Sequence, residues 1–140
     1  MTDNGNAMTG ARPQSILIVE DERTIRMIIK RIIMRLGIPC VREASDGSKA
    51  LSILKNTPVD FVITDWGMPS ISGLELLYLM HQDRQLMHVP VLFLTGRSDE
   101  QSVQRAIETG ANGYLIKPLT PELLVRKLEA MFLQRAQSRL

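Results

Sequence analysis

The sequence has little of what several classes of protein require. Cys40 is the only cysteine among 140 residues, so the chain can build neither a disulfide framework nor a cysteine metal cluster. We expect Cys40 to pack as a small apolar residue in a reduced cytoplasm. No apolar run approaches the roughly 18 residues of a membrane span, and the N-terminus lacks the basic and then apolar pattern of a signal peptide. These absences predict a cytoplasmic protein without membrane contact.

An excess of charge of one sign is also absent. The chain has 17 basic and 15 acidic residues, for a net charge of +2, which gives no reason to expect direct binding to nucleic acid. A length of 140 residues fits a single domain. We expect a disordered polar tail over residues 1–14, one folded domain over residues 15–134, and a polar C-terminal end over residues 135–140.

Strand and helix signals alternate five times along the chain. Short apolar runs, too short for helices, predict strands at residues 15–19, 40–44, 61–63, 91–94 and 112–116. A helical pattern follows each of them. This alternation predicts an α/β fold with a doubly wound parallel sheet and helices on both faces.

Capping side chains precede four of the predicted helices. They are Asp46, Thr120 and two capping boxes, Ser72 with Glu75 and Ser98 with Gln101. Apolar spacing then predicts the buried face of three helices. The first helix, residues 24–36, would bury Ile25, Ile28, Ile29, Ile32 and Leu36; the third would bury Leu74, Leu77, Tyr78 and His81; the fourth would bury Val103, Ala106 and Ile107.

The opposite face of the first helix is basic, and Met27 and Met34 lie on it two turns apart. A solvated helix face explains the charges alone. Exposed methionine is common on adaptable binding surfaces, so Met27 and Met34 are also candidates for a partner-docking surface.

Polar residues that a core does not require follow four of the predicted strands. They are Glu20 and Asp21, Asp65, Thr95, and Lys117. Because the carboxyl ends of parallel strands meet at one edge of the sheet, where ligands bind in such folds, we expect these side chains to lie together.

Three carboxylates gathered at one edge repel one another, at roughly 4 kcal/mol for each pair of charges about 4 Å apart at an effective dielectric of 20. Lys117 or a hard cation such as Mg²⁺ must offset this repulsion. A carboxylate facing Mg²⁺, a hydroxyl and an ammonium group is equipped to accept a phosphoryl group.

Four short segments together resemble the receiver domain of response regulators in two-component signalling, close to the stand-alone chemotaxis type. They are residues 18–22 (IVEDE), residues 65–69 (DWGMP) with Gly73, residues 95–96 (TG) and residues 117–118 (KP). The resemblance covers about residues 15–132. It implies a flavodoxin-like fold with strand order 2-1-3-4-5 and five flanking helices.

The resemblance implies a role for each acidic residue at the strand ends. Asp65 would be the phosphoacceptor. Asp21, Asp65 and the Gly67 carbonyl would bind Mg²⁺ directly, and Glu20 would act through a metal-bound water.

The remaining motif residues would hold the phosphoryl group and report it. Thr95 would hydrogen-bond the phosphoryl group and Lys117 would pair with it, and the Lys117–Pro118 bond would be cis. Tyr114 would turn inward when Thr95 moves toward the phosphate, so that Thr95 and Tyr114 form the switch.

Two positions depart from the common family pattern. Glu20 stands where aspartate is commoner, and Gly67 lacks a side chain that often influences the attacking water. Gly67 and Arg97, two residues after Thr95, are the positions expected to tune the lifetime of the phosphate.

The predicted function is that of a single-domain response regulator, a phosphoacceptor switch rather than an enzyme. A histidine kinase or histidine phosphotransfer protein would phosphorylate Asp65, and a downstream protein would read the face around Tyr114 with helices 98–108 and 120–132. The protein would be a monomer or a weak phosphorylation-dependent dimer. The cognate kinase, the target and the pathway stay open at this point.

Five alternatives remain in view. A phosphorelay intermediate or a phosphate sink would share the same site, and a receiver that dimerises without phosphorylation would not need the intact acid cluster. A phosphohydrolase with an aspartate nucleophile usually has a second acid two residues later, where this chain has Gly67. A flavodoxin-like cofactor binder needs a first loop that cradles phosphate, whereas residues 20–22 (EDE) would repel one.

Overall fold

The fold was obtained as a computed structural model, in which residues 12–138 are described. The predicted tail therefore lies largely outside the described residues, as do the last two residues of the chain. The elements in chain order are β1 (Ser15–Val19), α2 (Arg23–Arg35), β2 (Cys40–Ala44), α3 (Gly47–Asn56), β3 (Phe61–Thr64), α4 (Gly73–His81), β4 (Val91–Thr95), α5 (Glu100–Thr109), β5 (Gly113–Ile116) and α6 (Pro121–Ser138). All strand pairs are parallel, in the order β2-β1-β3-β4-β5, which confirms the predicted fold.

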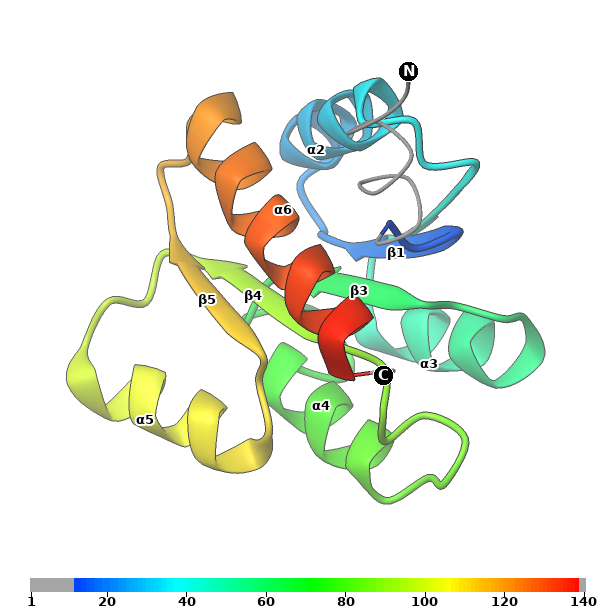
Figure 1. The fold of residues 1–140 in the computed structure, drawn as a ribbon. Coiled ribbons are helices and arrows are strands. Elements are labelled where there is room, and N and C mark those ends of the chain that lie inside the picture. The colour runs from blue at the N-terminus through cyan, green and yellow to red at the C-terminus, as the bar shows by residue number, and fades with distance from the viewer. Residues whose placement is uncertain (1–11, 139–140) are drawn as a thin grey trace.

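The sheet lies between two layers of helices, with α2 and α6 on one face and α3, α4 and α5 on the other (Figure 1). Side chains of β1 alternate between the two cores, because Ile16 and Ile18 pack with α2 and α6 while Leu17 and Val19 pack with the other helices. Strands β1, β3 and β4 are buried along their whole length. Continuous apolar runs are typical of parallel strands covered on both faces.

Helix starts follow the predicted caps in three cases. Asp46 accepts a hydrogen bond from the Lys49 amide, Ser72 accepts one from Glu75, and Thr120 accepts one from Leu123. The capping box predicted at residues 98–101 is wrong, because α5 begins one residue later.

The cap of α5 is Asp99 rather than Ser98. The Asp99 carboxylate accepts from the Ser102 amide at 2.9 Å. Serine and aspartate cap helices about equally well, but a charged acceptor makes the stronger bond to a backbone N–H. Two good caps in adjacent positions therefore left the start of the helix ambiguous by one residue.

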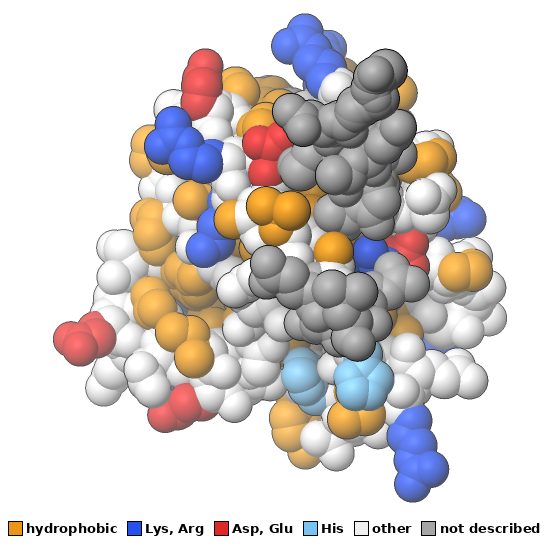
Figure 2. Space-filling view, in the orientation of Figure 1, with side chains coloured by type: hydrophobic (Ala, Val, Ile, Leu, Met, Phe, Trp, Pro, Cys, Tyr) orange, Lys and Arg blue, Asp and Glu red, His pale blue; other side chains and the backbone are white. Residues whose placement is uncertain are grey.

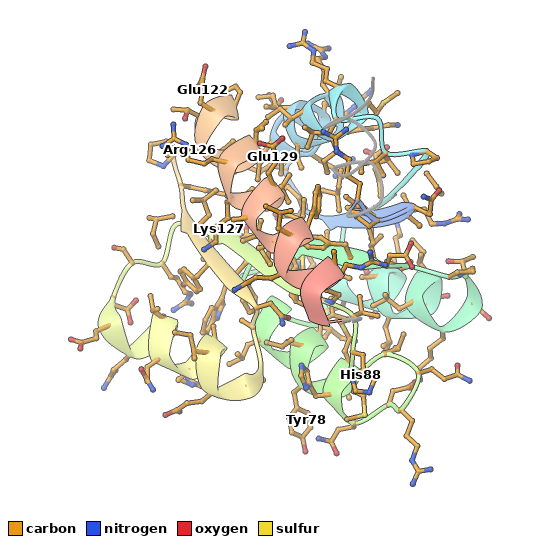
Figure 3. All side chains as sticks on the ribbon, viewed as in Figure 1. Tyr78, His88, Glu122, Arg126, Lys127 and Glu129 are labelled. Carbon is orange, nitrogen blue, oxygen red and sulfur yellow. The ribbon has the colours of Figure 1, made fainter. Side chains whose placement is uncertain are left out.

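Three apolar residues predicted to face the core are exposed instead. Ile28 is 45% exposed, and Tyr78 and Ile107 are more than half exposed; Figure 3 shows Tyr78 pointing outward from α4. The missed core residue of α2 is Ile33, which is fully buried next to Ile29. Spacing alone does not decide which edge of an apolar stripe turns inward, because docking on the sheet sets the rotation of the helix.

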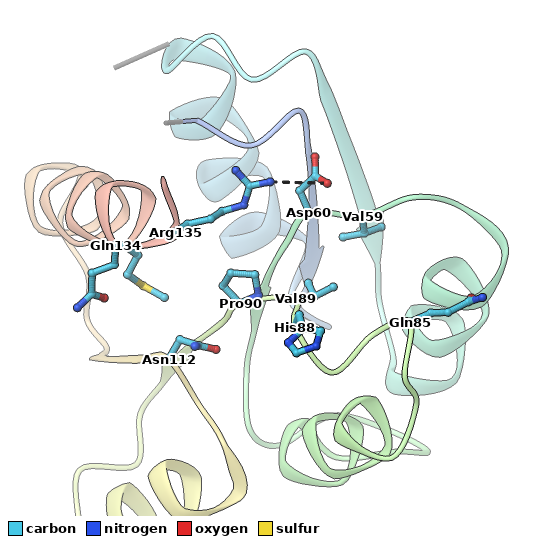
Figure 4. A pocket seen from close by; sticks show the side chains of 10 residues that line it. Val59, Asp60, Gln85, His88, Val89, Pro90, Asn112, Gln134 and Arg135 are labelled. Atoms are coloured by element: carbon cyan, nitrogen blue, oxygen red, sulfur yellow. Dashed lines mark ion pairs between the residues drawn. The ribbon is translucent and has the colours of Figure 1, made fainter. Parts of the chain in front are cut away.

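Asp60 organises the amino end of the sheet. Its Oδ2 accepts hydrogen bonds from the backbone amides of Gln14 at 3.0 Å and Ser15 at 3.2 Å, and its Oδ1 lies 3.9 Å from a guanidinium nitrogen of Arg135. Figure 4 shows this ion pair at the rim of a cavity of about 990 Å³. Arg135 belongs to α6, which extends to Ser138 and therefore includes most of the segment predicted as a polar C-terminal end.

Candidate functional site

The acidic residues that follow β1 and β3 meet at the carboxyl end of the sheet. Val19 pairs with Thr64 in the register of the two strands, and the Asp65 amide donates to the Val19 carbonyl at 3.1 Å. One carboxylate oxygen each from Glu20, Asp21 and Asp65 lie within 4.8 Å of one another. The structure thus brings together the three acids that the sequence pattern selects.

The three carboxylates differ in their surroundings. Glu20 is 2% exposed, Asp65 is half-buried and Asp21 is exposed. Asp65 Oδ1 accepts from the Trp66 amide at 2.7 Å, and Glu20 Oε2 accepts from the Glu22 amide at 3.1 Å. The Asp21 carboxylate has no hydrogen bond or ion pair within residues 12–138. Its oxygens are therefore available to a ligand.

Lys117 supplies the positive charge of the cluster. Its Nζ lies 2.9 Å from Glu20 Oε1 and 3.3 Å from Asp65 Oδ2. Burial is the main effect on Glu20 and raises the pKa of its carboxyl, although the hydrogen bond from Lys117 opposes the rise. Burial would lower the pKa of Lys117, but Glu20 and Asp65 outweigh it and the pKa is raised. Lys117 is held as an ammonium, and the Lys117–Pro118 bond is cis as expected.

Two glycines shape the loop after Asp65 in different ways. A Cβ on Gly73 would clash with the Asp65 carbonyl oxygen, so the start of α4 approaches the backbone of Asp65 more closely than any side chain allows. The Gly73 amide also donates to the Trp66 carbonyl at 2.7 Å. A Cβ on Gly67 would meet nothing within 4 Å. The site thus has room for a side chain at residue 67.

Thr95 and Tyr114 are linked through the backbone of Arg97. Thr95 is buried, and its hydroxyl accepts from the Arg97 amide at 3.3 Å. The Tyr114 hydroxyl donates to the Arg97 carbonyl at 2.8 Å. A change at Thr95 can therefore reach Tyr114 through a single residue.

An aromatic row also connects the site to Tyr114, and sequence reasoning missed it. The ring of Phe93 lies 5.7 Å from that of Trp66 and 6.0 Å from that of Tyr114. The Arg97 guanidinium stacks over Trp66, 5.0 Å from the ring centroid. The available signal was the position of Trp66 directly after Asp65, two residues past the end of β3.

The two methionines of α2 lie outside this cluster, on the solvent side of the helix. Met27 is 46% exposed and Met34 is 57% exposed. The structure therefore agrees with their predicted exposure and leaves their role a prediction. Within the described residues, none of the helices is both long and apolar enough to cross a membrane.

Comparison with known proteins identifies the class. The family described as the response regulator receiver domain matches residues 16–129, and the chain belongs to this family. Its members act in two-component signalling.

The relatives narrow the class to the chemotaxis type. Chemotaxis protein CheY-3 of Vibrio cholerae is 42% identical over 117 residues, which are 84% of this chain and 90% of that protein. The structure of Vibrio cholerae chemotaxis protein CheY4 superposes with a TM-score of 0.79 at 29% identity, over 85% of this chain and 98% of the other. The chain is thus a response regulator receiver domain of the CheY type.

A third similar structure shares the fold. It is the receiver domain of a sensor histidine kinase from Pseudomonas aeruginosa PAO1, with a TM-score of 0.76 at 24% identity, covering 86% of this chain and 98% of that one. In that protein a magnesium ion is coordinated in the active-site cleft.

Proposed function

We propose that this chain is a single-domain response regulator that accepts a phosphoryl group on Asp65 and signals through a protein contact. A histidine kinase or a histidine phosphotransfer protein is the donor. The observation that carries the proposal is the position of the Asp65 carboxylate, with one oxygen bound by the Trp66 amide and the other 3.3 Å from Lys117. This arrangement orients a nucleophilic oxygen beside a fixed positive charge.

In the transfer, an oxygen of Asp65 attacks phosphorus and the P–N bond to the donor imidazole breaks. The departing nitrogen keeps the electron pair and takes a proton from solvent, which leaves an acyl phosphate and a neutral imidazole. Lys117 offsets negative charge on the phosphoryl oxygens, and the Thr95 hydroxyl donates to one of them. Positioning and charge neutralisation are the main contributions that a protein makes to this reaction.

A magnesium ion fits the donor set of this site. Asp21 and Asp65 would offer carboxylate oxygens, the Gly67 carbonyl would offer a third ligand, and Glu20 would act through a water. Mg²⁺ prefers such hard oxygen ligands and retains several waters. When bound, it supplies charge neutralisation for the phosphoryl oxygens. The three acids within 4.8 Å of one another support this assignment.

The signal leaves the site through Thr95 and Tyr114. As Thr95 turns to the phosphoryl group, its bond from the Arg97 amide changes, and the Tyr114 hydroxyl is bound to the same residue. Tyr114 lies on β5 between α5 and α6, a face that exposes Ile107, Ile116 and Leu123. Exposed apolar residues of this kind suit a downstream protein target.

Met27 and Met34 on α2 are the proposed docking residues for the phosphodonor. The chain acts in the cytoplasm as a switch rather than an enzyme, without direct contact to nucleic acid or membrane, and as a monomer or a weak phosphorylation-dependent dimer. Figure 2 shows basic and acidic side chains interspersed on one face of the molecule, and such a face does not favour nucleic-acid binding.

Labelling with a small phosphodonor tests the proposed function. Purified protein incubated with acetyl phosphate and Mg²⁺ should gain one phosphoryl group at Asp65 that hydroxylamine removes. EDTA and the Asp65→Asn substitution should each abolish the label, while Asp60→Asn, at the opposite end of the sheet, should retain it. Absence of a label on the native chain, or its presence on Asp65→Asn, contradicts the proposal.

A further inference from the structure

The loop between β3 and α4 adopts an unusual backbone conformation at Ser70. Its φ is +67°, in the left-handed region, and within residues 12–138 it is the one residue other than glycine with a positive φ. This region is costly for a residue with a Cβ, and glycine is the residue that occupies it freely. Such a conformation persists only where the surrounding structure holds it, and it is common at functional sites. Contacts of the loop must therefore keep Ser70 in this conformation.

The contacts that hold Ser70 come from the amino end of α3. Its Oγ accepts hydrogen bonds from the Ser48 amide at 3.2 Å and from the Ser48 hydroxyl at 3.0 Å. The carbonyl of the preceding residue, Pro69, accepts from the Gly47 amide at 3.4 Å and from the Ile71 amide at 2.9 Å. We call the contacts of residues 69–70 with residues 47–48 the α3 clamp.

The α3 clamp also serves the helix. The first amides of a helix have no partner within the helix itself. The Asp46 carboxylate accepts from the amide of Lys49, whereas the amides of Gly47 and Ser48 find their acceptors in the loop. A Cβ on Gly47 would clash with the Ile71 carbonyl oxygen, so the loop approaches the helix more closely than a side chain allows. The loop and the start of α3 therefore stabilise each other.

The clamped residues belong to the same loop as two of the proposed metal ligands. Asp65 and the Gly67 carbonyl stand at its start, and Ser70 follows Gly67 by three residues. The start is fixed by the backbone of Trp66, whose amide donates to Asp65 Oδ1 and whose carbonyl accepts from the Gly73 amide at 2.7 Å. Gly67 itself is exposed, and a Cβ on it would meet nothing within 4 Å. The position of the Gly67 carbonyl therefore depends on the two fixed points on either side of it, Trp66 and Ser70.

We propose that Ser70 and Ser48 are positioning residues for the divalent cation, because the α3 clamp keeps the loop on the path that presents the Gly67 carbonyl. This inference rests on the proposed function, since it concerns the metal site that serves Asp65. Both serines act through the loop backbone rather than as ligands. Without the α3 clamp, Ser70 returns to a negative φ, which redirects the chain on its amino side and moves the carbonyl. A ligand that is already in place when the ion arrives costs less to order, so the clamp raises the affinity for the ion.

A matched pair of substitutions at Ser70 tests the inference. Ser70→Ala removes the hydroxyl acceptor and keeps the cost of a positive φ. Ser70→Asn keeps a side-chain acceptor, and asparagine enters the left-handed region more readily than most residues with a Cβ. Ser52→Ala removes an exposed hydroxyl of α3 outside the clamp and is the control.

The probe is Mn²⁺, which takes the same hard oxygen ligands as Mg²⁺. The electron paramagnetic resonance signal of the free ion measures binding, and competition by Mg²⁺ verifies that both ions share the site. Circular dichroism and urea denaturation report the fold and stability of each variant, so that affinity is compared between folded proteins.

We expect Ser70→Ala to weaken Mn²⁺ binding about 5-fold, and Ser70→Asn and the control to stay within about 2-fold of the native chain. Ser48→Ala should weaken binding in the native chain but add nothing in Ser70→Ala, because the acceptor of the Ser48 hydroxyl is then already gone. Labelling of Ser70→Ala by acetyl phosphate should be slow at low Mg²⁺ and should reach the native rate at saturating Mg²⁺, since the clamp changes occupancy of the site rather than the transfer itself.

Other outcomes overturn the inference. Native Mn²⁺ affinity in Ser70→Ala would do so, and a loss of stability without a loss of affinity would make the α3 clamp purely structural. Equal weakening by Ser70→Ala and Ser70→Asn would remove the clamp as the cause, and slow labelling at every Mg²⁺ concentration would contradict an effect on occupancy. Failure of the proposed function is distinguishable, since the native chain would then take no label from acetyl phosphate.

Discussion

The two ends of the sheet use aspartate in opposite ways. At the amino end, Asp60 accepts from two backbone amides and pairs with Arg135, so both of its oxygens have partners. At the carboxyl end, Glu20, Asp21 and Asp65 share the ammonium of Lys117 and two backbone amides. One end has enough donors for its acid, and the other has too few for its acids.

The difference separates a structural carboxylate from a reactive one. A carboxylate whose lone pairs are all engaged holds chain segments together, and removing it exposes unpaired donors. Carboxylates with a shortage of donors retain repulsion and free lone pairs, which a cation and a phosphoryl group can use. This difference between the two ends of the sheet can be tested by substitutions, beginning with the one that we expect to have the largest effect.

Replacing the basic residue at each end of the sheet should affect the phosphorylation of Asp65 unequally. Lys117→Met should slow labelling of Asp65 by acetyl phosphate about 100-fold, because a fixed donor to the phosphoryl oxygens is lost. Arg135→Met should leave labelling within about 2-fold, because Arg135 pairs with the structural acid. Mass spectrometry of the time course measures both, and circular dichroism confirms that each variant folds. Equal labelling rates in the two variants would contradict the different roles assigned to the two ends of the sheet.

Removing the Asp60 carboxylate at the amino end of the sheet should lower the stability of the fold and leave the phosphorylation of Asp65 unchanged. Asp60→Ala leaves the Gln14 and Ser15 amides without their acceptor, and we expect a loss of about 1–3 kcal/mol in the free energy of unfolding. Urea denaturation measures this loss. Labelling at Asp65 should match the native chain. Native stability together with impaired labelling would reverse the roles assigned to the two ends.

Substitutions at the rim of the carboxyl end should alter how long the phosphate persists. Gly67→Asn adds a side chain where a Cβ has open space, and Arg97→Glu removes the stack on Trp66 and reverses its charge. Each should change the rate of phosphate loss by a factor of about 3 or more, since Gly67 and Arg97 lie near Asp65, where the acyl phosphate is proposed to form. Decay of the label after the donor is removed gives the rate. Unchanged decay in both variants would exclude this tuning.

A well-paired acid on β2 should behave as Asp60 does. The bonds from Lys30 and Arg26 lower the pKa of Glu43, so its stabilising effect is present above the unfolded value of 4.5 and is lost as pH falls through the folded value. Glu43→Gln should cost less than about 1 kcal/mol at neutral pH, because the pair is partly exposed. The difference from the native chain should shrink in urea denaturation below pH 4.5. A stability difference between Glu43→Gln and the native chain that increases at low pH would contradict the predicted pH dependence.

Much of this contrast could be predicted from the sequence, and the reasons differ by element. Buried parallel strands appear as unbroken apolar runs, and the residues after them must share an edge, so the acid cluster and Lys117 were predictable. The order of the strands came from the family resemblance, since alternation alone does not fix it. Asp60 was not predicted as a clamp, because its partners are distant backbone amides that leave no pattern in the sequence.

Side-chain orientation was the least predictable feature. The rotation of α2 buried Ile33 and exposed Ile28, although both fit an apolar stripe. The link from Arg97 to Trp66 and Tyr114 depends on the path of a loop, and no periodicity reports such a path.

The position of Trp66 gives this protein a built-in optical reporter. It is the only tryptophan in the chain, its amide binds the carboxylate of Asp65, and a guanidinium covers its ring. Emission excited through the indole therefore originates beside the acid pocket and from no other part of the molecule. The proposed metal entry and phosphate turnover would therefore be open to measurement by fluorescence in the unlabelled protein, with the native chain and each variant compared in the same cuvette.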